Sequence, residues 1–254
     1  MIEFSHVCAG YKKKEVLHDI TFAAQKGTVT ALVGKNGSGK STLVACALGL
    51  LPVTSGAIAL AGKPLKEYTR QELARTISLL PQVLPNPSVT AEELIAFGRA
   101  PYTGLSGRLS PADKDAVARA AALCGVEELL SRPVPTLSGG ERQRVCLAMA
   151  LAQETPVMLF DEPSSSLDVG ARSEFLQLLR RLARELGRTV VVITHDLADA
   201  VTLADDLVVL DGGCVAYAGP AAKEAETQTL ERVFGVARHT FEENGQTFTV
   251  FTAK

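Results

Sequence analysis

Nine consecutive residues near the start of the chain have the composition of a phosphate-binding loop. The run Gly34-Lys35-Asn36-Gly37-Ser38-Gly39-Lys40-Ser41-Thr42 fits the pattern G-x-x-x-x-G-K-[ST]. Glycines let backbone N–H groups close around phosphate oxygens, and the N-terminus of a following helix favours the same negative charge. We expect Lys40 to reach the β- and γ-phosphates of a nucleotide and Ser41 to ligate Mg²⁺.

The surroundings of this loop favour phosphate binding over a glycine-rich turn with a chance lysine. Residues Thr28–Val33 are β-branched and apolar, as expected of a buried strand, and residues Lys40–Leu48 have a helical pattern. A strand, loop and helix in this order are the setting that the motif requires. The loop alone leaves kinases, GTPases and many ATPases open.

A second run of residues predicts another helix N-terminus that can bind an anion. In Leu137-Ser138-Gly139-Gly140-Glu141-Arg142-Gln143, a serine and two glycines precede an apolar helical pattern. The simpler interpretation is an ordinary helix with Ser138 as its N-cap. The complete heptapeptide beside a phosphate loop makes that simpler interpretation the weaker one.

Two acids follow a buried-strand pattern further along the chain. Asp161 and Glu162 come directly after Val157–Phe160. Asp161 is suited to hold Mg²⁺ or its waters, and Glu162 can act as general base on the attacking water. An isolated Asp-Glu pair is more often a solvated turn, but the apolar run and the phosphate loop upstream reverse that preference.

With these motifs in this order, nearly the whole chain resembles the nucleotide-binding domains of ATP-binding cassette (ABC) proteins, whose signature is Leu-Ser-Gly-Gly-Glu. The resemblance implies an α/β fold of the P-loop NTPase type. It would have a mostly parallel sheet core, an N-terminal antiparallel β subdomain and an inserted helical lobe. P-loop kinases and GTPases have no use for residues Leu137–Gln143 and are nearly excluded.

The resemblance also assigns roles to residues that could otherwise be ordinary. His195 would contact the γ-phosphate and the lytic water, Gln82 would contact Mg²⁺ and transmit the nucleotide state, and Tyr11 would stack on adenine. Asp168, after Ser166-Leu167, would communicate across a junction between two domains. The alternatives are a helix cap or polar filler for His195, a solubilising glutamine for Gln82 and an exposed tyrosine for Tyr11.

Family members of this kind pair head to tail, which implies that each ATP lies between two copies. Lys40 of one copy would face Ser138, Gly139 and Gly140 of the other. One cassette is present here, so two copies, or one copy and a related chain, must combine for turnover.

The strand and helix patterns predict how the chain is divided. Buried-strand runs recur at Val157–Phe160, Thr189–Ile193 and Leu207–Leu210 with helical patterns between them, which indicates a largely parallel sheet. One of these helical patterns places five apolar side chains on a single stripe that we expect to face the core: Phe175, Leu178, Leu179, Leu182 and Leu186. We expect a nucleotide-binding core over 1–82 and 155–220, an inserted helical lobe over 83–154, and a short tail over 221–254 that ends in an edge strand. Helix starts are expected at Thr90 and Ser110.

Composition sets limits on the partners. The net charge of −2 among 254 residues gives no general attraction for nucleic acid, and the five cysteines lack metal-ligand spacing, so we expect reduced core thiols. The longest apolar stretch, Leu43–Val53, is too short to span a bilayer. A transporter role therefore requires separate polytopic permease subunits, with this chain peripheral on the cytoplasmic face of the membrane.

A finer resemblance concerns the transported substrate. The segments Leu79–Gln82, Thr90–Leu94, Phe97–Tyr102 and Gly107–Ser110 look like those of ATPases that serve importers of iron–siderophore chelates, haem and cobalamin. Such importers also use a substrate-binding protein, which would be an indirect partner. The segments could instead reflect lobe packing and turn chemistry alone.

An ABC ATPase that acts on DNA or ribosomes is the competing class of function. It is disfavoured because the sequence has no long heptad insertion, no zinc-ligand pairs and no second cassette.

Overall fold

The computed structural model describes the chain except residues 13, 105–106, 164–168 and 244–245. The chain forms two compact units, one built from residues 1–67 and 176–254 and the other from residues 68–175. Helix α6, Val169–Arg184, crosses the sequence boundary between them. The two units are described separately below.

The first unit contains the parallel strands that lead into the phosphate loop. β3 (Val29–Gly34) pairs in parallel with β8 (Thr189–Ile193) and with β9 (Asp206–Asp211), and β10 (Cys214–Pro220) pairs antiparallel with β9. Every residue of β3 and β8 is buried, so neither strand alternates apolar with polar residues. The predicted strands in this part of the chain are confirmed.

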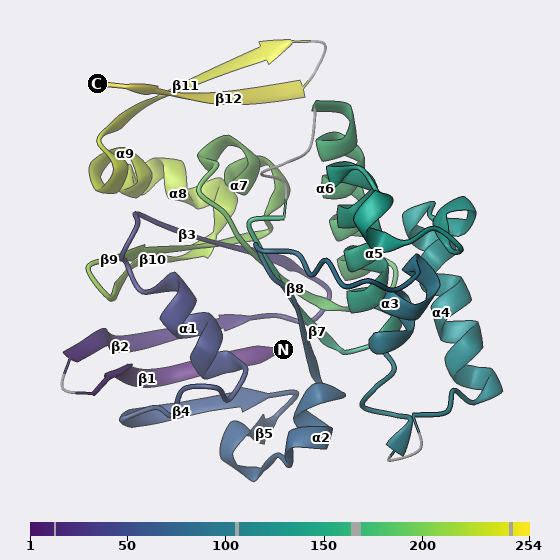
Figure 1. Cartoon of the computed structure of the whole chain (residues 1–254). Coiled ribbons are helices and arrows are strands. Elements are labelled where there is room, and N and C mark those ends of the chain that lie inside the picture. The colour runs from purple at the N-terminus through teal and green to yellow at the C-terminus, as the bar shows by residue number, and fades with distance from the viewer. Residues whose placement is uncertain (13, 105–106, 164–168, 244–245) are drawn as a thin grey trace. The chain divides into compact units, whose positions relative to one another are not determined.

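A separate antiparallel sheet in the same unit has the strand order β2-β1-β4-β5 (Figure 1). It consists of β1 (Ile2–Tyr11), β2 (Lys14–Ala24), β4 (Ser55–Leu60) and the short β5 (Lys63–Pro64). The predicted fold class, a mostly parallel core with an antiparallel N-terminal sheet, is confirmed.

Short helices and a hairpin complete the first unit. The helices are α1 (Lys40–Ala47), α7 (Leu197–Leu203), α8 (Ala221–Thr227), α9 (Thr229–Phe234) and the 3₁₀ turn η1 (Leu65–Glu67). β11 (Val236–Glu243) and β12 (Gln246–Ala253) form the C-terminal hairpin. The expected edge strand is therefore one arm of a hairpin, whose other arm the sequence analysis missed.

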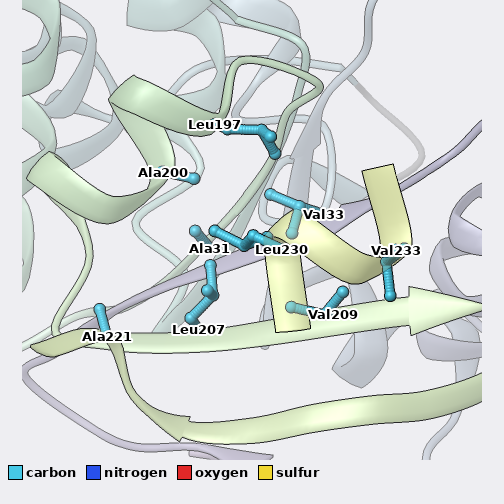
Figure 2. Packing of buried hydrophobic residues seen from close by; sticks show 9 residues of the cluster. All are labelled: Ala31, Val33, Leu197, Ala200, Leu207, Val209, Ala221, Leu230 and Val233. Atoms are coloured by element: carbon cyan, nitrogen blue, oxygen red, sulfur yellow. The ribbon is translucent and has the colours of Figure 1, made fainter. Parts of the chain in front are cut away.

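One apolar cluster joins the parallel strands to the helices of the tail, as Figure 2 shows. Side chains from β3 and β9 meet Leu197 and Ala200 of α7, Ala221 of α8, and Leu230 and Val233 of α9. Leu230 is fully buried and also donates its backbone N–H to Glu224 Oε1 at 2.7 Å. The tail is thus packed against the strands that support the phosphate loop.

The second unit combines two parallel strands with a group of helices. β6 (Ile77–Leu80) pairs with β7 (Val157–Asp161). The helices are α2 (Arg70–Ala74), α3 (Ala91–Phe97), α4 (Pro111–Cys124) and α5 (Gly139–Ala152), with 3₁₀ turns η3 (Glu127–Leu129) and η4 (Val134–Thr136). Thr90 and Ser110 cap α3 and α4 through capping boxes, as predicted.

Two expectations about burial were wrong in part. Leu186 was placed on the apolar stripe of α6, but the helix ends at Arg184 and Leu186 is 51% exposed. Cys46, Cys124 and Cys146 are buried free thiols, whereas Cys214 is exposed and Cys8 is half-buried. Burial raises the pKa of the Cys124 thiol to about 12, which makes it a poor nucleophile.

Across the part of the chain that the structure describes, no helix combines the length and the apolar character that crossing a bilayer requires.

Replacing Leu230 by alanine should destabilise the first unit. The change removes a fully buried side chain from the cluster in Figure 2 and should lower the free energy of unfolding by about 2–5 kcal/mol. Thermal and denaturant unfolding of the full chain measure this. Leu186→Ala is the matched control, because truncating an exposed leucine should change stability by about 0.5 kcal/mol or less. Equal effects of the two substitutions would contradict the packing described here.

Candidate functional site

The phosphate loop lies between β3 and α1, where backbone geometry requires glycine. Gly39 has φ +104° and is the N-cap of α1, with no side-chain hydrogen bond capping that helix. A Cβ on Gly34 would lie 2.4 Å from Ser38 Oγ and 2.6 Å from the carbonyl oxygen of Leu210. The tight loop therefore excludes larger residues at Gly34 and leaves the first amides of α1 without a side-chain cap.

Lys40 lies across its own loop. Its Nζ donates to the carbonyl oxygen of Gly34 at 2.6 Å and to that of Lys35 at 3.1 Å. An ammonium held at the mouth of the loop is placed to bind a phosphate oxygen there. A neutral backbone carbonyl is a weaker acceptor for an ammonium than an anionic phosphate, so phosphate can replace these carbonyls as the partner of Lys40.

The other loop residues differ in exposure. Lys35, Asn36, Gly37 and Ser41 are exposed, whereas Thr42 is buried. Ser38 Oγ is also buried, and no hydrogen-bond partner is found for it among the described residues. Buried polar groups are usually satisfied, so an unsatisfied hydroxyl in the loop fits a ligand that supplies the missing partner.

His195 and Tyr11 stand at strand ends in the first unit. His195 follows β8 and is exposed. The N-cap of α7 is Asp196, whose side chain accepts from the backbone N–H of Asp199 at 2.9 Å, so His195 does not cap this helix. Tyr11 ends β1 and is 53% exposed, which is compatible with stacking on a planar ligand. Their assigned roles stay predictions.

In the second unit, the strand pair brings Gln82 and Glu162 together. Leu80 and Phe160 are register partners at the ends of β6 and β7, and the chain continues from them to Gln82 and Glu162. Gln82 Nε2 donates to Glu162 Oε2 at 2.6 Å. The two residues were selected separately from the sequence, and their contact was not predicted.

Glu162 also has an unusual backbone conformation. Its φ of +49° lies in the left-handed region, which non-glycine residues seldom adopt. Strain of this kind clusters at active sites and ligand clamps. The turn after β7 therefore holds the Glu162 backbone in a left-handed conformation at some conformational cost.

The oxygen donors expected for Mg²⁺ have suitable chemistry. Asp161 ends β7 beside Glu162, the Gln82 side chain offers a carbonyl oxygen, and the exposed Ser41 offers a hydroxyl. Magnesium in nucleotide sites binds one or two carboxylates together with substrate phosphates and waters. Among the described residues, no cluster of three or more His, Cys, Asp or Glu side chains is placed to hold a metal ion.

The signature residues form the start of α5. Ser138 is the N-cap: its Oγ accepts from Glu141 N–H at 3.3 Å, and its own N–H donates to Glu141 Oε2 at 2.8 Å. Hydrogen bonds from Ser138 to the Glu141 carboxyl, first the one from the Ser138 backbone, together with the Arg132 guanidinium, hold the pKa of this carboxyl below its ordinary value. The lowered pKa keeps the Glu141 carboxylate charged to lower pH, and the charged form accepts the Ser138 N–H bond that caps the helix.

The two glycines of the signature are not required by the packing described for this chain. Both lie in α5, and a Cβ built on Gly139 or Gly140 meets nothing within 4 Å among the described residues. Glycine is less favourable in a helix than alanine, by about 0.5–1 kcal/mol in a helix interior. A group that approaches the helix start closely from outside the chain would explain them.

Asp168 lies outside the described residues, together with Ser166 and Leu167. Its expected role at a junction between two copies stays a prediction.

The phosphate loop, the capped signature helix and the acidic turn after a buried strand define an ATP-hydrolysing P-loop protein. The sequence model of the family described as "ABC transporter" matches residues 17–165, which is more than half of the chain. The chain belongs to the ABC transporter family and is an ATPase of that family.

Two curated relatives and one solved structure show which members of this family the chain is similar to. It is 37% identical to the iron(3+)-hydroxamate import ATP-binding protein FhuC of Bacillus subtilis (strain 168), over 89% of this chain and 85% of that protein. It is 42% identical to the hemin import ATP-binding protein HmuV of Nocardia farcinica (strain IFM 10152), over 87% of this chain and 76% of that protein. An inward-facing structure described as a metal-chelate type ABC transporter aligns with a TM-score of 0.86 at 25% identity, over 99% of this chain and 96% of that one.

Replacing Lys40 by alanine should remove the cationic contact to phosphate. We expect ATP turnover to fall by about 10²–10³, the usual effect of deleting one electrostatic stabiliser of the transition state. Steady-state ATPase assays and equilibrium nucleotide binding measure the change. Lys66→Ala is the control, because Lys66 is an exposed lysine on η1 of the same unit and should retain normal turnover. Unchanged ATP affinity and turnover in the Lys40 variant would refute the phosphate site.

Proposed function

We propose that this chain is the ATP-driven motor subunit of an importer for iron chelates of the siderophore or haem type, and that it works as a head-to-tail pair. The observation that carries the proposal is the start of α5, where Gly139 and Gly140 face no group of the described chain. A helix N-terminus with two glycines is suited to bind phosphate at close range. In a pair, that phosphate belongs to the ATP held by Lys40 of the other copy.

In this proposal, Lys40 and the loop amides hold the β- and γ-phosphates of ATP. Ser138 and Gly140 of the second copy bind the γ-phosphate from the opposite side, with Gly139 between them in the helix start. The adenine stacks on Tyr11, whose ring is exposed at the end of β1. ATP therefore joins the two copies, and its hydrolysis releases them.

Glu162 is the proposed general base. Its carboxylate takes the proton of the attacking water, while His195 orients the γ-phosphate and that water. Ser41, Gln82 and Asp161 would hold Mg²⁺, which when bound neutralises charge that develops on the phosphate oxygens.

The hydrogen bond between Gln82 and Glu162 supports a gating role for Gln82. Its amide occupies Glu162 Oε2 at 2.6 Å, an acceptor that a general base needs for the water proton. We propose that Gln82 leaves Glu162 when nucleotide binds. The chain continues from Gln82 to α3, so the departure of Gln82 from Glu162 can be coupled to a movement of the helical lobe over residues 83–154.

The same proposal also implies a membrane partner and a location for the chain. The chain would attach to separate polytopic permease subunits at the cytoplasmic face of the membrane and act indirectly with a substrate-binding protein. The hydroxamate and hemin importers to which it is similar support an iron chelate as the cargo. Asp168 would contribute to contacts between the two copies.

Glu162→Gln should separate binding from hydrolysis. The amide cannot accept the proton from water, so turnover should fall by about 10²–10⁴ while ATP binding persists. The variant should then accumulate as an ATP-bridged dimer, detected by sedimentation with and without ATP. Glu185→Gln makes the same change at an exposed carboxylate beyond α6 and should behave as wild type. Wild-type turnover in Glu162→Gln would refute the base assignment.

Co-purification tests the transporter role. Tagged chain recovered from native membranes should bring down a polytopic protein, and that protein, reconstituted in liposomes, should stimulate the ATPase activity of the added wild-type chain. Lys40→Ala should be recovered with the same polytopic protein but give no stimulated activity. Recovery with ribosomes or DNA, and not with a membrane protein, would support the competing function.

A further inference from the structure

Arg132 lies in an irregular segment of the second unit, between η3 and η4, and none of the motifs discussed above includes it. Its guanidinium makes two contacts. Nη1 donates to Glu141 Oε1 at 2.9 Å, and Nη2 donates to the carbonyl oxygen of Thr136 at 2.9 Å. Thr136 precedes Ser138 by two residues and Glu141 follows it by three, so Arg132 restrains the chain on both sides of the signature serine.

The two carboxylate oxygens of Glu141 have different partners. Oε2 accepts from the backbone N–H of Ser138 and completes the capping box, while Oε1 accepts from Arg132. The capping box alone would preserve the helix start. The contact with Arg132 adds a restraint on where that helix start points, because it ties Glu141 to a second part of the chain.

The backbone around Arg132 is itself fixed. The carbonyl oxygen of Arg132 accepts from Ala91 N–H at 2.9 Å, that of Leu130 accepts from Glu92 N–H at 3.0 Å, and Thr90 forms an isolated antiparallel bridge with Pro133. These contacts anchor the segment to the start of α3. Arg132 therefore connects the N-terminus of α3 through its backbone to the N-terminus of α5 through its side chain.

We infer that Arg132 is a positioning residue for the signature: it holds the start of α5 in the orientation in which Ser138 and Gly140 bind the ATP of a second copy. The inference rests on the proposed head-to-tail pair. Phosphate contacts are sensitive to displacements of about 1 Å, so a small loss of order at this helix start weakens the pair strongly. ATP binding by a single copy depends on the phosphate loop and does not require Arg132.

The experiment compares dimer formation with nucleotide binding in the Glu162→Gln background. Sedimentation over a range of protein concentrations gives the dissociation constant of the ATP-bound dimer. A fluorescent ATP analogue, titrated into protein below that constant, gives the affinity of the single copy. Adding Arg132→Gln should weaken the dimer by about three- to tenfold, the range for losing a partly exposed charged hydrogen bond. Single-copy affinity should stay within about twofold, since the loop is unchanged.

Arg119→Gln is the matched control. Arg119 belongs to the same unit, is 60% exposed and makes an ion pair with Glu154 at 2.9 Å, away from the signature residues in the sequence. Arg119→Gln removes the same charge and a similar ion pair, so the dimer should form as it does with Glu162→Gln alone.

Glu141→Gln provides a second test that keeps the helix cap. Glutamine at this position can still form a capping box, but it has one acceptor oxygen where Glu141 uses two. The Arg132 and Glu141 changes should be non-additive, with the double substitution weakening the dimer by no more than Arg132→Gln alone, because Glu141→Gln also removes the carboxylate that Arg132→Gln leaves unpaired.

The outcomes separate the two hypotheses. If Glu162→Gln forms no dimer with ATP, the proposed pair fails. If it does form a dimer, and Arg132→Gln leaves the dimer unchanged, the positioning role fails while the proposed function stands. Equal losses of single-copy ATP affinity and of dimer formation, or additive effects of Arg132→Gln and Glu141→Gln, would also overturn the positioning role.

Discussion

An α-helix leaves its first backbone N–H groups without partners inside the helix. The candidate site depends on which of these N–H groups are capped by a side chain and which are not. α2, α3, α4 and α5 each begin with a capping box, but α1 begins at Gly39 with no side-chain cap. The first amides of α1 therefore have no side-chain acceptor, and in the proposed function they bind phosphate. The α5 box uses the N-cap and third amides, so the amides of Gly139 and Gly140 between them stay outside it.

The supporting structure serves to hold these helix starts in place. β3 is buried along its whole length and ends at the phosphate loop, so the loop is anchored by the core of the first unit. The cluster around Leu230 extends that core into the tail. In the second unit, β6 and β7 carry Gln82 and Glu162 past their ends into contact. Parallel strands release their chains at the same edge of a sheet, and this explains why residues distant in sequence meet there.

Features that local sequence determines were predictable. The buried strands were visible as apolar β-branched runs, and the starts of α3 and α4 were visible because a capping box needs two residues at fixed spacing. The antiparallel N-terminal sheet was expected from family resemblance and not from periodicity. β11 was missed because Val236–Glu243 contains charged residues, including Arg238, whose side chain pairs with the fully buried Glu224.

The contacts that define the site depend on tertiary structure and had no local signal. Nothing in the sequence around Gln82 indicates that its amide reaches Glu162, and Arg132 has no motif that links it to Glu141 nine residues later. For Leu186 the sequence predicted a contact that does not form. The helical spacing of apolar residues continues to Leu186, but α6 ends at Arg184 and Leu186 is exposed. Sequence spacing selected the candidate residues, whereas their contact partners became visible only in the folded structure.

The proposed division of the site between two copies would also constrain the surface of the chain. The net charge of −2 is small, so two identical copies repel each other little at long range and the local charges decide their association. At the start of α5, the negative charge of Glu141 is neutralised by Arg132, so an approaching phosphate meets helix amides and not an unpaired carboxylate. In the proposed pair, Arg132 would therefore also favour an anion at the helix start electrostatically, in the same direction as its proposed positioning of the signature.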